Sequence, residues 1–130
     1  MNTRVLVAED DADMRQVLVY ALMAVGVEQD DIVDVGRGDE AVRLTVDDSF
    51  DLMVLDWYMP GLDGMDIVRT VRALGSDVPI IMVTGEKHRD LVVAAIEGGI
   101  TDYVIKPFDH DALLGKFAKY CPGSPAHQSA

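Results

Sequence analysis

Short apolar runs alternate along this chain with longer segments whose apolar residues recur at helical spacing. The apolar runs are rich in β-branched residues and show little polar alternation, which is typical of strands buried on both faces of a parallel sheet. We expect such strands at Arg4–Ala8, Ile32–Val35, Leu52–Asp56, Pro79–Thr84 and Asp102–Ile105.

The segments between these runs predict helices. One apolar face defines the first helix, and it contains Met14, Val17, Leu18, Ala21, Leu22 and Val25. Either Asp11 or Asp13 is suited to cap its start, and Gly26 stands where a glycine commonly ends a helix. Further helices are expected at Gly38–Asp47, Asp63–Leu74, His88–Gly98 and Asp109–Tyr120.

Strands alternating with helices predict an α/β fold, a doubly wound, flavodoxin-like sheet of five parallel strands with five helices. The common strand order for such a sheet is 2-1-3-4-5. Ligands then bind at the carboxyl ends of the strands, beside the point between strands one and three where the winding reverses. The residues that follow those two strands are therefore the first place to look for a site.

Composition narrows the class of protein. The 130 residues fit one domain over residues 1–121 and a disordered tail over 122–130, with no output domain after it. A formal net charge of -12 argues against binding to nucleic acid or to an anionic membrane. The single cysteine, Cys121, cannot form an internal disulfide, and no run is long enough to span a membrane. We therefore expect a cytoplasmic protein without a signal peptide.

Polar residues at the strand ends suggest phosphoryl chemistry. Glu9 and Asp10 follow the first strand, and Asp56 ends the third. Asp56 is a candidate nucleophile that forms an aspartyl-phosphate, and Glu9 and Asp10 are candidate ligands for Mg²⁺, which prefers oxygen donors. At the ends of strands four and five, Thr84 can donate a hydrogen bond to a phosphoryl oxygen and Lys106 can pair with another.

Four motifs in register resemble a response-regulator receiver domain, close in pattern to the single-domain chemotaxis regulator. They are Val-Leu-Val-Ala-Glu-Asp-Asp from Val5, Asp56-Trp-Tyr-Met-Pro-Gly-Leu-Asp-Gly, Val83-Thr84-Gly85 and Lys106-Pro107-Phe108. The resemblance implies that Asp56 accepts the phosphoryl group, that the backbone carbonyl of Tyr58 is a further metal ligand, and that Lys106 precedes a cis proline. It also implies that Thr84 and Tyr103 are the switch residues.

Three positions depart from the common pattern of that family. Glu9 replaces the frequent aspartate, and only one of Asp10 and Asp11 need bind metal, with Asp10 the better match. Tyr58 and Glu86 stand at positions that tune the phosphoryl lifetime in the family. We expect the Tyr58 side chain to block part of the path of the in-line attacking water, and so to slow the loss of phosphate.

The resemblance implies a phosphorylation-driven binding switch with only self-catalysed phosphotransfer and slow autodephosphorylation, rather than an enzyme that turns over. The donor would be a sensor histidine kinase or a histidine phosphotransfer protein. An unidentified protein partner would bind the face made by the fourth helix, fifth strand and fifth helix, with the chain a monomer or weak dimer. Alternatives are an aspartate-nucleophile phosphatase, a flavodoxin-type cofactor binder and a pseudo-receiver that is not phosphorylated.

Overall fold

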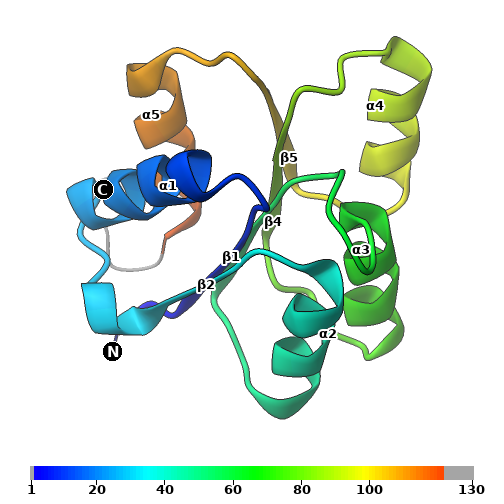
Figure 1. Ribbon diagram of the computed structural model, residues 1–130, viewed down its shortest axis with the longest axis horizontal. Coiled ribbons are helices and arrows are strands. Elements are labelled where there is room, and N and C mark those ends of the chain that lie inside the picture. The colour runs from blue at the N-terminus through cyan, green and yellow to red at the C-terminus, as the bar shows by residue number, and fades with distance from the viewer. Residues whose placement is uncertain (1, 122–130) are drawn as a thin grey trace.

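The fold is a five-stranded parallel sheet covered by helices on both faces, seen in a computed structural model that describes residues 2–121 (Figure 1). The strand order β2-β1-β3-β4-β5 confirms the predicted fold class. The strands are β1 Val5–Ala8, β2 Ile32–Val35, β3 Leu52–Leu55, β4 Ile80–Thr84 and β5 Asp102–Ile105. The tail predicted for residues 122–130 lies outside the described residues.

Helices α1 and α5 cover one face of the sheet, and α2, α3 and α4 cover the other (Figure 1). Their bounds are α1 Ala12–Ala24, α2 Gly38–Asp47, α3 Gly64–Ala73, α4 Arg89–Glu97 and α5 His110–Tyr120. A one-turn 3₁₀ helix, Gln29–Asp31, precedes β2 and was not predicted from the pattern. Within residues 2–121, no helix is both long and apolar enough to cross a bilayer.

The three central strands are buried along their whole length, as the apolar runs predict. The two edge strands are not, since Asp34 on β2 and Ile105 on β5 are exposed. The expectation of burial on both faces is therefore right for the centre of the sheet and wrong for its edges, which have a neighbouring strand on one side only.

The apolar face of α1 differs from the predicted one at two positions, Val17 and Val19. Val17 is 38% exposed, whereas Val19 is only 6% exposed. Asp11, not Asp13, caps the helix, because its Oδ1 accepts hydrogen bonds from the amides of Asp13 at 2.9 Å and Met14 at 3.3 Å. Gly26 has a φ of +104°, so it ends the helix in the left-handed conformation that glycine favours.

Two glycines bring the loops at the carboxyl edge of the sheet into close contact. A Cβ atom on Gly38 would lie 1.6 Å from the carbonyl oxygen of Leu62, and one on Gly64 would lie 2.3 Å from that of Asp56. The amide of Gly64 also donates to the carbonyl of Trp57 at 2.7 Å. This packing fixes the loop that follows β3, which carries the predicted phosphoacceptor.

Helix α5 is tied to the edge of the sheet through one carboxylate. The Lys116 ammonium donates to Asp102 Oδ1 at 2.7 Å, and the Tyr120 hydroxyl donates to Asp102 Oδ2 at 3.0 Å. Although burial opposes it, these bonds hold the pKa of Asp102 below its ordinary value. The contact fixes the start of β5 against the last turns of α5.

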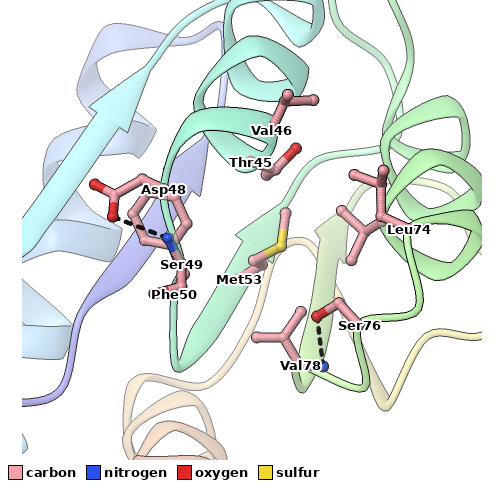
Figure 2. A pocket seen from close by; sticks show the side chains of 10 residues that line it. Thr45, Val46, Asp48, Ser49, Phe50, Met53, Leu74, Ser76 and Val78 are labelled. Atoms are coloured by element: carbon pink, nitrogen blue, oxygen red, sulfur yellow. Dashed lines mark hydrogen bonds between the residues drawn. The ribbon is translucent and has the colours of Figure 1, made fainter.

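A cavity of about 290 Å³ lies at the amino ends of β3 and β4, between the carboxyl ends of α2 and α3 (Figure 2). Phe50, Met53 and Val78 line it, together with the exposed Val46 and Leu74. None of the predicted site residues lines this cavity. It is therefore separate from the acidic edge of the sheet.

Candidate functional site

Buried polar side chains gather at one edge of the sheet. Among residues 2–121, the buried polar or charged residues are Glu9, Asp56 and Thr84, which as whole residues are 0%, 8% and 0% exposed. Glu9 follows β1, Asp56 follows β3, and Thr84 ends β4, so all three lie at the carboxyl ends of neighbouring strands. Burying polar groups opposes folding unless they are paired, so this concentration marks the candidate site.

Lys106 joins two of these residues. Its ammonium donates a hydrogen bond to Glu9 Oε1 and another, of 2.9 Å, to Asp56 Oδ2. Burial lowers the pKa of Lys106, but the bonds to the two carboxylates outweigh this and leave it raised. The lysine is therefore charged, and it stands between the two carboxylates that would otherwise repel each other.

The acidic residues form a cluster suited to a hard cation. Carboxylate oxygens of Glu9, Asp10 and Asp56 all lie within 4.8 Å of one another. Burial raises the pKa of Glu9 to about 7, against the opposing hydrogen bond from Lys106. Asp11 lies outside the cluster because its side chain caps α1, which favours Asp10 as the ligand.

An all-oxygen donor set of this kind fits Mg²⁺. Glu9 is fully buried and Asp10 is exposed, so the cluster runs from the interior to solvent and can be reached by a hydrated ion. The predicted backbone ligand, the carbonyl of Tyr58, stays a prediction. Its amide donates to Asp56 Oδ1 at 3.4 Å, so Tyr58 does lie beside the cluster.

The two predicted switch residues both contact the loop between β4 and α4. The Thr84 hydroxyl oxygen accepts from the amide of Glu86 at 3.4 Å, and the Tyr103 hydroxyl donates to the carbonyl of Glu86 at 2.6 Å. Tyr103 is half-buried, and burial raises its pKa to about 12. Lys106 lies next to Thr84, because its amide donates to the Thr84 carbonyl at 2.9 Å.

The predicted lifetime residues contact each other, which their positions in the sequence did not indicate. The Tyr58 hydroxyl donates a hydrogen bond to Glu86 Oε1. The Tyr58 side chain is 53% exposed and stacks on Trp57 with ring centroids 6.0 Å apart. The Lys106-Pro107 bond is cis, as the resemblance implies.

One positioning residue was missed. Arg15 on α1 donates from its guanidinium to the carbonyl of Glu9 at 2.8 Å and to the Asp34 carboxylate at 3.1 Å. It therefore holds the backbone that carries the first two carboxylates of the cluster. The sequence carried no signal for this role, since an arginine on an amphipathic helix more often faces solvent.

A doubly wound sheet with an acidic cluster, a lysine and a threonine at its carboxyl edge defines a receiver-type signalling domain. The family described as response regulator receiver domain matches residues 5–118, and the chain belongs to this family. It is 34% identical over 118 residues to the chemotaxis protein CheY of Pseudomonas aeruginosa, covering 89% of this chain and 94% of that protein. A CheY homolog of Campylobacter jejuni is also 34% identical, covering 87% of this chain and 88% of that protein.

Solved structures agree on the fold. The receiver domain of the Francisella response regulator 1452 superposes with a TM-score of 0.83 at 28% identity, covering 92% of this chain and 96% of that one. The signal receiver domain of a LuxO repressor-like protein from Vibrio parahaemolyticus gives 0.84 at 24% identity, covering 92% and 90%, a likeness that concerns the fold alone. The chain is thus a receiver domain of the CheY type, the class used as a two-component signalling switch.

Proposed function

We propose that this receiver domain accepts a phosphoryl group on Asp56 in a Mg²⁺-dependent reaction and then binds a protein partner through the face made by α4, β5 and α5. The observation that carries the proposal is the joint contact of Lys106 with Glu9 and Asp56, beside the three-carboxylate cluster. Asp56 is 8% exposed, and its two carboxylate oxygens accept hydrogen bonds from the Lys106 ammonium at 2.9 Å and from the Tyr58 amide at 3.4 Å.

The chemical step is a displacement at phosphorus. A carboxylate oxygen of Asp56 forms the new P–O bond while the P–N bond of a phosphohistidine breaks, and the departing imidazole nitrogen takes a proton from water. Bound Mg²⁺ would supply charge neutralisation between the carboxylates and the phosphoryl oxygens, held by Glu9, Asp10, Asp56 and the carbonyl of Tyr58. The Lys106 ammonium and the Thr84 hydroxyl would each hold one phosphoryl oxygen.

Donor and partner follow from the same chemistry. A sensor histidine kinase or a histidine phosphotransfer protein provides the phosphohistidine, and the domain itself supplies no turnover beyond slow loss of phosphate. The face proposed for the partner carries exposed apolar side chains, Leu91 at 39%, Ile96 at 54% and Ile105 at 42%. Charge added at Asp56 would shift the conformations of Thr84 and Tyr103, and through them it would change the shape of this face.

The test is a titration with Mg²⁺ and then with acetyl phosphate, followed by the fluorescence of Trp57, the one tryptophan in the chain. Trp57 directly follows Asp56, so we expect a change with each addition and a gain of one phosphoryl group by mass spectrometry. Asp56→Asn should respond to acetyl phosphate in neither measurement. If wild type and Asp56→Asn behave alike, the proposal is wrong, and if acetyl phosphate is consumed over many turnovers without a stable adduct, a phosphatase is the better description.

The lifetime of the adduct is tested separately at Tyr58. Its ring stacks on Trp57 beside Asp56, where it would restrict the approach of water. Tyr58→Asn removes the ring and should speed the loss of phosphate. An unchanged rate of dephosphorylation would show that the ring gives no shielding.

A further inference from the structure

Hydrogen bonds with three other side chains, those of Tyr58, Tyr103 and Thr84, converge on Glu86, in the loop between β4 and α4. Its carboxylate accepts from the Tyr58 hydroxyl, its carbonyl accepts from the Tyr103 hydroxyl at 2.6 Å, and its amide donates to the Thr84 hydroxyl oxygen at 3.4 Å. One residue therefore contacts both predicted switch side chains and the loop that follows the phosphoacceptor. Thr84 and Tyr103 contact its backbone, whereas Tyr58 contacts its side chain.

Tyr58 connects this loop to Asp56. Its amide donates to Asp56 Oδ1 at 3.4 Å, and its ring is held by stacking on the nearly buried Trp57, with an interplanar angle of 20°. The phenol thus starts from a fixed loop and reaches a residue 28 positions further along the chain. This is a direct link between the loops after β3 and after β4.

The carboxylate of Glu86 is held at both oxygens. Oε1 accepts from Tyr58, and Oε2 accepts from the amide of His88, the residue before α4, at 3.0 Å. The hydrogen bond from the Tyr58 hydroxyl lowers the pKa of Glu86, so the carboxylate is ionised and the bond is charge-assisted. A carboxylate fixed in this way also fixes the backbone that offers its carbonyl to Tyr103.

We propose that the hydrogen bond between the Tyr58 hydroxyl and the Glu86 carboxylate is a latch that couples the phosphoacceptor loop to the switch loop. Tyr58 is then a positioning residue, since it acts through Glu86 by holding the carbonyl where the Tyr103 hydroxyl reaches it. This role differs from restricting the approach of water to the phosphoryl group, because that effect depends on the Tyr58 ring, whereas the latch depends on the hydroxyl. The inference rests on the proposed function, because its main readout is phosphorylation of Asp56.

The test separates hydroxyl from ring by using Tyr58→Phe. We measure the rate of labelling by acetyl phosphate in Mg²⁺ for wild type, Tyr58→Phe, Glu86→Ala and the double variant. A hydrogen bond of ordinary net strength corresponds to a change of roughly fivefold in rate if it is made in the reactive conformation. Tyr58→Phe should lose about that much and Glu86→Ala, which also lacks the bond from the His88 amide, at least as much, while the double variant should lose no more than Glu86→Ala, because all three lack the bond between Tyr58 and Glu86.

A second readout follows Tyr103 directly. With 3-fluorotyrosine incorporated, the ¹⁹F resonance of Tyr103 should shift toward the solvent-exposed position in Tyr58→Phe and Glu86→Ala, and stay near wild type in Glu86→Gln, whose amide oxygen still accepts from the Tyr58 hydroxyl. Tyr20→Phe is the matched control, since this tyrosine on α1 is 61% exposed and should change neither readout.

The outcomes are distinguishable. If wild type is not labelled at all, the proposed function fails and the ¹⁹F shift alone decides the latch. If wild type is labelled and Tyr58→Phe matches it in both rate and resonance, the latch is refuted while the proposed function stands. Rate losses that multiply in the double variant would likewise overturn the latch, because they would show that the two side chains act independently. Because Tyr58 is 53% exposed, the variants should have the same urea midpoint of unfolding as wild type. This midpoint is measured first.

Discussion

Replacing Lys106 with methionine tests whether one ammonium holds the acidic edge of the sheet together. The Lys106 side chain is 20% exposed, while those of Glu9 and Asp56 are 1% and 10% exposed. Methionine keeps most of the length of the side chain and removes its charge. Two nearly buried carboxylates would then face each other without the cation that now lies between them.

The cost can be bounded from this geometry. Removing one partner of a fully buried ion pair destabilises a protein by about 3–5 kcal/mol. Lys106 is partly exposed, and Glu9 can take up a proton because burial has already raised its pKa to about 7. Both effects reduce the penalty, so we expect a loss of about 2 kcal/mol in the free energy of unfolding. With a urea m-value of about 1.5 kcal/mol per molar, the midpoint falls by roughly 1.3 M.

The assay is urea unfolding at pH 7 followed by Trp57 fluorescence, with and without Mg²⁺. Added Mg²⁺ should narrow the difference in midpoint between variant and wild type, because Mg²⁺ bound at the cluster as proposed would replace the missing positive charge. Lys119→Met is the control, since this lysine is exposed and its cation–π contact with the ring of Tyr120 contributes at most about 1 kcal/mol, less than the loss expected for Lys106→Met. A Lys106→Met midpoint equal to that of wild type without Mg²⁺ would refute the reasoning.

Other parts of the structure give three further predictions. Arg15→Met removes the guanidinium that holds the backbone of the acidic cluster, so calorimetry should show Mg²⁺ binding weakened by roughly threefold, at a stability cost of about 1 kcal/mol. Gly38→Ala should lower the free energy of unfolding, measured in urea, by about 3 kcal/mol, because the added Cβ would lie 1.6 Å from a carbonyl oxygen. Gly115→Ala on α5 is the control: its Cβ would meet nothing within 4 Å, so it should stabilise the protein by up to about 1 kcal/mol. Asp102→Asn should lower the free energy of unfolding by about 1 kcal/mol at pH 7. Because the pKa of this carboxyl is depressed in the folded state, the difference in stability from wild type should shrink as the pH falls below about 4. A difference that stays constant with pH would contradict the ion pair.

The fold could be predicted from the sequence because its signals are local and repeated. Apolar runs such as Leu52–Leu55 are too short for a helix and too apolar for a surface strand, which leaves a buried parallel strand. Because the strands alternate with helices and run parallel, the carboxyl ends of all five strands lie at the same edge of the sheet, so Glu9, Asp56 and Thr84 could be grouped from the sequence alone. Lys106 directly follows β5, so the same rule places it at this edge, where it contacts Glu9 and Asp56.

Features set by tertiary packing could not be predicted in this way. The run Val17-Leu18-Val19 is apolar at each position, so its spacing alone does not tell which valine faces solvent. The contact between Tyr58 and Glu86 joins two loops, and no local pattern encodes a hydrogen bond across 28 residues. Both residues could be singled out by their family positions, but only the folded structure shows that they contact each other.

The burial of Glu9, Asp56 and Thr84 in an otherwise apolar interior explains why chemistry at this edge would be felt in the loop after β4. A phosphoryl group on Asp56 adds negative charge to a site whose nearest cation, Lys106, is already shared with Glu9. Another buried side chain at this edge that can donate is Thr84, whose hydroxyl oxygen now accepts from the amide of Glu86. A movement of Thr84 toward Asp56 would therefore change the contacts of Glu86, which also contacts Tyr58 and Tyr103, so a change of charge in the pocket would alter the conformation of the loop after β4.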